Sequence, residues 1–187
     1  MNQQLIKPVD EKEIQHATFS MFLNTAPGVD GMSHLFFQRY WHIIKADLIH
    51  AITSFFHTRN LLKSVNETLI SLIPKVDNPV ILSNFRPISL CSVLYKIISK
   101  ILASRLKSVL HPCITPSQSA FVPGRQILDN VMIAHEILHF LKNKRSGKVG
   151  FMSIKLDMFK AYDRVEWKYL GRIMIHMGFC PILFNGS

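Results

Sequence analysis

Hydrophobic residues recur at steps of three and four positions in four stretches of the chain. This spacing places side chains on one face of an α-helix, so each stretch predicts a helix with a buried side. The first four predicted helices cover residues 10–23, 34–57, 92–110 and 127–141, and the last begins at Asp163 and is closed by Gly178 and Pro181. The first and the last helix both begin with the Asp-x-x-Glu spacing of a capping box.

Two shorter runs predict strands instead. Residues 68–73 form an apolar run with β-branched members that ends at Pro74. Residues 149–157 alternate, with Met152, Ile154 and Leu156 facing one way and the polar positions between them the other. Loops are expected at 78–87 and 116–124, and residues 182–187 look like the start of a further strand. The order of elements predicts an α+β fold that is rich in helices and has few strands.

Composition and charge restrict the class of protein. Of 187 residues 48% are hydrophobic and 18% charged, which favours a globular domain, or a large piece of one, over a disordered chain. Lys and Arg outnumber Asp and Glu by 22 to 12, and a net charge of +10 is typical of proteins that bind polyanions. A protein that binds an acidic membrane surface would have the same excess of basic residues. Four basic residues share helix 92–110, namely Lys96, Lys100, Arg105 and Lys107. Their spacing alone leaves a solvated helix face and a nucleic-acid surface equally open.

The cysteines and the hydrophobic runs bear on location. Cys91, Cys113 and Cys180 are odd in number and far apart, which fits neither a disulfide framework nor a Cys-x-x-Cys metal site. No stretch reaches the roughly 18 apolar residues of a membrane-spanning helix, and no signal peptide is evident. We therefore expect a soluble intracellular protein of the cytoplasm or nucleus, with no membrane partner.

Asp157 is the acidic residue with the clearest chemical potential. It ends the predicted strand 149–157, where burial of a carboxylate is unfavourable unless another group compensates its charge. A pair of Mg²⁺ ions would do so, since hard cations take carboxylate and carbonyl oxygens. The alternative is an ordinary turn or capping aspartate between strand and helix.

Several segments around Asp157 resemble the motifs of one family in their order along the chain. They cover residues 26–31, 84–90, 95–106, 117–130 and 154–167, the last reading Ile-Lys-Leu-Asp-Met-Phe-Lys-Ala-Tyr-Asp-Arg-Val-Glu-Trp. The family is that of the reverse transcriptases of LINE-type (non-LTR) retrotransposons, plant ones in particular. Residues 154–167 resemble its first catalytic motif, and residues 84–90 and 95–106 resemble its fingers motif.

The resemblance implies roles for individual residues. Asp157 matches the first metal-binding aspartate, and the Met158 carbonyl would join it on Mg²⁺. Tyr162 matches the aromatic residue that packs beneath the sugar of the incoming nucleotide. Arg86 matches a fingers arginine that pairs with the triphosphate, and Arg125 would support the template or nucleotide.

The resemblance also implies partners and domains. The expected ligands are an RNA template, an RNA–DNA duplex and deoxynucleoside triphosphates. The basic residues expected to contact the nucleic acid are Lys96, Lys100, Arg105 and Lys155. Residues 1–148 would form an N-terminal extension and fingers, and residues 149–187 the start of a palm. The family's Ala-Asp-Asp motif, its glycine-glutamine motif and its thumb do not follow. We therefore expect a truncated polymerase fragment with a short internal deletion, inactive alone, or else a non-catalytic remnant that binds RNA or DNA.

A different enzyme class is suggested by His135-Glu136-x-x-His139, which satisfies the His-Glu-x-x-His pattern of zinc peptidases. On a helix both histidines would share one face, with Glu136 placed as a general base. However, no third ligand follows at a standard spacing, and a plain amphipathic helix explains the pattern as well.

Overall fold

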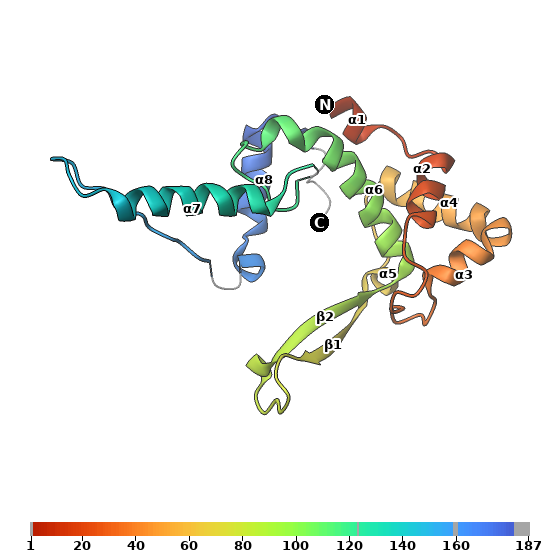
Figure 1. Cartoon of the computed structure of the whole chain (residues 1–187). Coiled ribbons are helices and arrows are strands. Elements are labelled where there is room, and N and C mark those ends of the chain that lie inside the picture. The colour runs from red at the N-terminus through yellow and green to blue at the C-terminus, as the bar shows by residue number, and fades with distance from the viewer. Residues whose placement is uncertain (1, 123, 159–160, 182–187) are drawn as a thin grey trace. The chain divides into compact units, whose positions relative to one another are not determined.

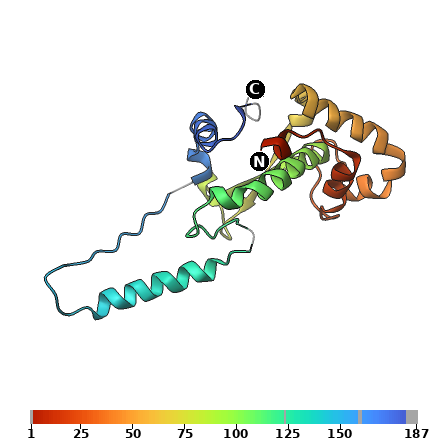
Figure 2. The ribbon, with the colours of Figure 1, turned by 90° about the horizontal axis from the view of Figure 1, so that it is seen from above.

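The computed structural model describes residues 2–122, 124–158 and 161–181, apart from the side chains of Tyr162 and Asp163 (Figures 1 and 2). It divides into two compact units. The first consists of residues 2–107 together with Cys180 and Pro181, and the second of the described residues within Ser108–Phe179.

The first unit is a helical cluster with a two-stranded ribbon. In chain order its elements are α1 (Asn2–Ile6), α2 (Glu11–Phe19), α3 (His34–Arg39), α4 (Trp41–Thr58), α5 (Lys63–Asn66), β1 (Thr68–Pro74), β2 (Phe85–Cys91) and α6 (Val93–Leu110), whose last turn enters the second unit. The core lies between α2, α3, α4 and α6. Its best-buried side chains are Ile14, Ala17, Ile52, Val93, Ile97 and Ile101.

The predicted capping box at the start of α2 is confirmed. The Asp10 carboxylate accepts a hydrogen bond from the backbone N–H of Glu13 at 2.8 Å. This bond, followed by the contact with Lys7, lowers the pKa of Asp10 below its ordinary value. The helix ends at Phe19, four residues earlier than predicted.

The single helix predicted over 34–57 is wrong, because the chain leaves helical geometry at Tyr40 (φ −101°, ψ 20°) and forms α3 and α4. Phe37 before the break and Leu48 and Ile52 after it all reach the same core. Hydrophobic spacing therefore continues across the break and does not reveal it.

β1 and β2 form an antiparallel hairpin in which Thr68 is opposite Cys91 and Pro74 opposite Phe85. The strand predicted over 68–73 is confirmed, but the loop predicted over 78–87 is too long. A short 3₁₀ turn (Leu82–Asn84) leads directly into β2. Pro87 lies inside β2 opposite Leu72, a position that a two-stranded ribbon tolerates because each strand has one free edge.

The second unit contains a 3₁₀ turn (His111–Cys113), α7 (Ile127–Asn143), a second such turn (Ala161–Arg164) and α8 (Trp167–His176). The helix predicted over 127–141 is confirmed as α7. The last predicted helix begins later than expected, since Asp163 belongs to the 3₁₀ turn and Glu166 precedes α8 without a side-chain cap. The Gly178 closure is confirmed by its positive φ of 86°.

The strand predicted over 149–157 is wrong. Residues 149–158 have no regular secondary structure, and Met152, Ile154 and Leu156 are 80%, 66% and 90% exposed. A strand requires a hydrogen-bonded neighbour, and β1 and β2 form the one sheet found in the described part of the chain. The further strand expected at 182–187 lies outside the described residues.

Candidate active site and nucleic-acid interface

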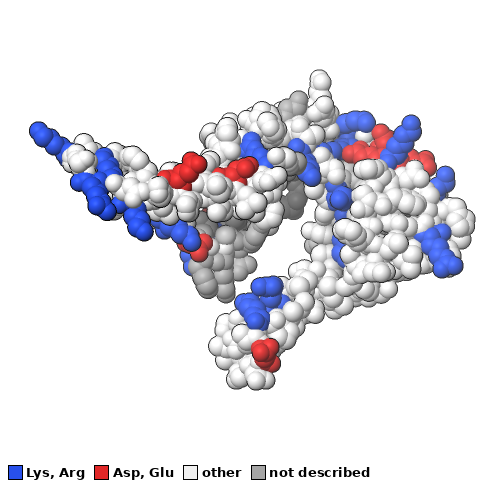
Figure 3. Space-filling view, in the orientation of Figure 1, with Lys and Arg blue, Asp and Glu red and all other residues white. Residues whose placement is uncertain are grey.

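The predicted site residues are divided between the two units. Arg86, Lys96, Lys100 and Arg105 belong to the first, and the others to the second. Basic side chains occur on both units (Figure 3).

Asp157 and Met158 lie at the end of the irregular segment 149–158, and both are exposed. Within the described residues, no hydrogen bond or ion pair involves the Asp157 carboxylate, and no three His, Cys, Asp or Glu side chains gather closely enough to hold a metal ion. Asp157 with the Met158 carbonyl offers part of a ligand set for Mg²⁺. The described residues do not complete that set, so they do not fit a finished magnesium site.

Tyr162 is placed only by its backbone, in the 3₁₀ turn Ala161–Arg164 five residues after Asp157. Its side chain lies outside the described residues. The expected contact with the sugar of a nucleotide stays a prediction.

Arg86 lies on β2 directly opposite Ile73 and is exposed. The hairpin holds it near the end of the ribbon, where the backbone N–H of Lys75 donates to the Asn84 carbonyl at 2.8 Å and the Lys75 ammonium to the Ser83 carbonyl at 3.0 Å. No contact of the Arg86 guanidinium occurs among the described residues. Its donors therefore face solvent, as an anion-binding role requires.

The surroundings of Arg105 contradict the role predicted for it. Its side chain is 7% exposed and donates to both carboxylate oxygens of Glu13, at 2.6 and 2.7 Å. Further hydrogen bonds reach the carbonyls of Leu5, Lys7 and Pro8, and the guanidinium lies 5.3 Å from the centre of a phenylalanine ring on α4. The prediction that Arg105 contacts nucleic acid is wrong, because the guanidinium fixes the N-terminal segment to α6.

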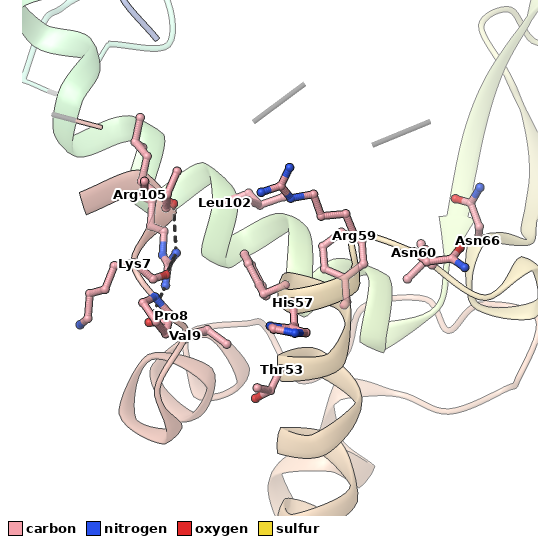
Figure 4. Close-up of a pocket in the computed structure, with 15 residues that line it drawn as sticks. Lys7, Pro8, Val9, Thr53, His57, Arg59, Asn60, Asn66, Leu102 and Arg105 are labelled. Carbon is pink, nitrogen blue, oxygen red and sulfur yellow. Dashed lines mark hydrogen bonds between the residues drawn. The ribbon is translucent and has the colours of Figure 1, made fainter. Parts of the chain in front are cut away.

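Arg105 also forms one end of a cleft of about 800 Å³ in the first unit (Figure 4). The rest is lined by the N-terminal segment 5–9, the C-terminal end of α4, residues 59–61 after it, Asn66 of α5 and Leu102 of α6. Figure 4 shows the Arg105 guanidinium turned toward Lys7 and Pro8. None of the other predicted site residues lies in this cleft.

The other basic residues predicted for nucleic acid differ among themselves. Lys96 is half-buried, and its ammonium donates to the Ala26 carbonyl at 2.9 Å, so it holds the turn at 26–31. Lys100 on α6 and Lys155 in the irregular segment are exposed. Their contact with nucleic acid stays a prediction.

The turn at 26–31 packs against the junction of β2 and α6. A Cβ atom on Gly28 would lie 2.6 Å from the Ser92 nitrogen and 2.7 Å from the Cys91 carbonyl carbon, so only glycine fits there. Next to the turn, His34 is 2% exposed and contacts the Thr25 hydroxyl through Nδ1. Burial lowers the pKa of His34, and the charge of Lys96 lowers it further.

Arg125 closes its own loop. Its guanidinium donates to the carbonyls of Thr115, Gln118 and Ile114. The Asn130 amide adds a bond of 2.9 Å to the Ser117 carbonyl. These contacts account for Arg125 as a residue that shapes the loop, and its contact with template or nucleotide stays a prediction.

The zinc pattern lies on the exposed surface of α7. The Nε2 atom of His139 accepts from the Asn143 amide at 2.9 Å. In the described residues His135, Glu136 and His139 do not form a three-ligand group.

No described helix is long and apolar enough to span a membrane.

The sequence interpretation missed Glu13 and His34. Glu13 is 92 residues from Arg105, and no local pattern connects the two. His34 follows a turn and begins an amphipathic helix, which gives no sign that its ring is buried.

Comparison with known proteins identifies the family. A family model for reverse transcriptase (RNA-dependent DNA polymerase) matches residues 73–186. The chain is 40% identical over 169 residues, 90% of its length, to the Transposon TX1 uncharacterized 149 kDa protein of Xenopus laevis. It is 25% identical over 92% of its length to a retrovirus-related Pol polyprotein from a type-1 retrotransposable element R2 of Popillia japonica. It is 28% identical over 84% of its length to the counterpart from the type-2 element R2DM of Drosophila melanogaster.

The chain spans 13%, 23% and 14% of the lengths of these three relatives. The resemblance to LINE-type elements is confirmed by the family match and by the names of the relatives, while its plant-like character stays a prediction. The zinc peptidase and the non-catalytic remnant are not favoured, because the match runs through α7 and Asp157 as one polymerase segment. The chain belongs to the reverse transcriptase family, as a segment of a non-LTR retrotransposon protein.

Proposed function

We propose that this chain supplies the fingers and the beginning of the palm of an RNA-directed DNA polymerase. The observation that carries the proposal is the family match over 73–186, which includes both Arg86 and the motif around Asp157. Residues 1–148 correspond in this proposal to an N-terminal extension with fingers, and residues 149–187 to the start of the palm. The polymerase would copy an RNA template from deoxynucleoside triphosphates and hold an RNA–DNA duplex.

Each proposed role uses a group that the structure leaves accessible or that matches a motif. Arg86 would bind the triphosphate of the nucleotide through its exposed guanidinium. Tyr162 would pack under the sugar. Lys100 and Lys155, both exposed, would neutralise phosphates of the nucleic acid.

Proteins of this family generally use a divalent metal. Mg²⁺ would supply the charge stabilisation needed for transfer of a nucleotidyl group. Asp157 and the Met158 carbonyl are the groups of this chain proposed to face it. The remaining ligands would have to come from residues other than those described here.

A chimera tests the proposal directly. The segment of the Xenopus relative that matches this chain is replaced by the matching 169 residues of this chain, and primer extension on an RNA template is measured. We expect extension by the chimera and its loss with Asp157→Asn. Asp47→Asn, an equally conservative change at an exposed position of α4 outside the motif segments, is the matched control and should leave extension intact. Extension that survives Asp157→Asn would contradict the assignment.

A further inference from the structure

Positive charge is concentrated in the turn after α7. The proposed catalytic roles do not involve these residues. Four basic residues lie within seven positions, namely Lys142, Lys144, Arg145 and Lys148, and we refer to residues 142–151 as the basic turn. No acidic residue occurs between Glu136 and Asp157. In Figure 3 Lys and Arg side chains gather at the C-terminal end of α7.

Contacts within the second unit hold the basic turn in shape. The Lys144 ammonium lies 3.6 Å from the centre of the Phe151 ring. The same ring packs edge-on against Phe140 of α7, with ring centres 6.1 Å apart. Gly147, with φ +122°, allows the chain to reverse between them. The ends of the turn are therefore joined through aromatic contacts rather than through an acidic partner.

The remaining charges of the basic turn point to solvent. Lys142, Arg145 and Lys148 are exposed, and no ion pair involves them within the described residues. This differs from the first unit, where Lys7 is paired with Asp10 and Lys45 with Glu11. Clustered like charges without counterions repel one another, and a polyanion that neutralises them releases its own bound cations on binding.

The turn also borders a hollow of about 300 Å³, lined by Lys144, Arg145, the hydrophobic residues Leu141 and Phe151, and residues 146, 147, 149 and 150. Small, exposed residues such as Ser146 and Gly147 beside basic side chains suit a phosphate group, because backbone N–H groups and cationic side chains both donate to phosphate oxygens. The exposed face of Phe151, which is 58% exposed, lies beside them and offers a surface on which a base can stack.

We propose that the basic turn is a nucleic-acid binding site that grips the phosphates of a single RNA strand through Lys142, Arg145 and Lys148. The choice of RNA rests on the proposed function, since an RNA-templated polymerase is in continual contact with that polyanion. The turn ends six residues before Asp157, within the same compact unit. An RNA strand bound there would lie on the same compact unit as the motif around Asp157.

Two variants of equal charge separate a local site from general attraction. The turn variant carries Lys142→Gln, Arg145→Gln and Lys148→Gln, and keeps Lys144 because it contacts Phe151. The control variant carries Lys7→Gln, Lys12→Gln and Lys45→Gln, which are exposed and lie beside acidic residues of α2 or its N-cap. Each variant lowers the formal net charge of +10 by three.

Binding of a short labelled single-stranded RNA to the full chain is measured by fluorescence anisotropy over a range of salt concentrations. For the turn variant we expect affinity at low salt to fall about tenfold or more, and the salt dependence to flatten by about two units of slope, as loss of three phosphate contacts predicts. The control variant should change affinity less than about threefold, because its charges are partly compensated.

Equal losses in both variants, or no loss in the turn variant, would overturn the inference. Binding to anionic lipid vesicles is measured alongside. A turn variant that keeps RNA binding but loses binding to these vesicles would also overturn the inference. Crosslinking with a photoreactive RNA gives a second measurement that needs no variant: the crosslinked peptide should contain residues of the basic turn, and crosslinks confined to other peptides would contradict it. Failure here is distinct from failure of the proposed function, which is judged by the dependence of primer extension on Asp157.

Discussion

The contacts of Arg105 predict that one substitution loosens the N-terminal segment. Arg105→Met keeps much of the length and the apolar stem of the side chain but removes every guanidinium donor. The Glu13 carboxylate then loses two hydrogen bonds of 2.6 and 2.7 Å. The carbonyls of Leu5 and Lys7 lose theirs as well.

The size of the effect follows from burial. Removing one partner of a buried ion pair costs about 3–5 kcal/mol. The Arg105 side chain is 7% exposed and that of Glu13 is 25% exposed. Water can therefore partly hydrate the unpaired Glu13 carboxylate, so the cost of breaking the ion pair lies at the low end of that range. A backbone carbonyl left without its donor adds about 1 kcal/mol if it stays buried. We therefore expect Arg105→Met to lower the free energy of unfolding by about 3–4 kcal/mol.

Urea denaturation followed by far-ultraviolet circular dichroism measures the loss, and limited trypsin digestion locates it. Cleavage after Lys12 should accelerate when segment 5–13 is released from α6. Lys100→Met, an exposed position on the same helix, is the control and should change little. A loss below about 1 kcal/mol for Arg105→Met would mean that the pair behaves like a surface salt bridge, and the reasoning from burial would fail.

Four further outcomes follow from the structure. Gly28→Ala should lower the free energy of unfolding by about 1–3 kcal/mol in the same denaturation assay, because its Cβ would overlap the backbone of Ser92, and an unchanged value would contradict the close packing. The pKa of His34 is lowered by burial, so the folded state binds its proton less readily than the unfolded state. Stability should therefore be complete above the unfolded pKa near 6.5 and fall as pH drops below it, and His34→Gln should flatten that slope between about pH 5 and 7. The purified chain should extend no primer on RNA with Mg²⁺ or Mn²⁺, and extension abolished by Asp157→Asn would refute this. Elemental analysis of protein purified without chelators should find far less than one zinc per chain, and a full complement that disappears with His139→Ala would revive the zinc hypothesis.

Helices were predicted well where their pattern is local. The apolar faces of α6 and α7 follow from side chains three and four residues apart, so their bounds, Val93–Leu110 and Ile127–Asn143, are close to those predicted. The break at Tyr40 was missed because the residues on both sides pack into one core. The shortest helices, α1 and α5, were missed because one turn contains too few residues for a periodic pattern.

Site residues were predicted less well because their roles depend on partners distant in sequence. Lys96, Lys100 and Arg105 are equivalent as charges on a predicted helix. In the structure Lys96 holds the turn at 26–31, Lys100 faces solvent, and Arg105 is buried against Glu13. The charge pattern identifies basic residues, but the choice between a solvated, a binding and a buried role is made by tertiary contacts.

The failed strand at 149–157 bears on catalysis as well as on fold. Its alternating pattern describes a stretch with one apolar face, yet Met152 and Leu156 on that face are exposed because no described strand pairs with it. Asp157, at the end of this stretch, was expected to need compensation for burial, and in the structure it is exposed. A carboxylate held only by irregular backbone lacks the rigid position that metal-assisted phosphoryl chemistry requires. Pairing of residues 149–157 with another strand would bury the apolar face and fix Asp157 in one step, so the catalytic role proposed for Asp157 depends on formation of that sheet.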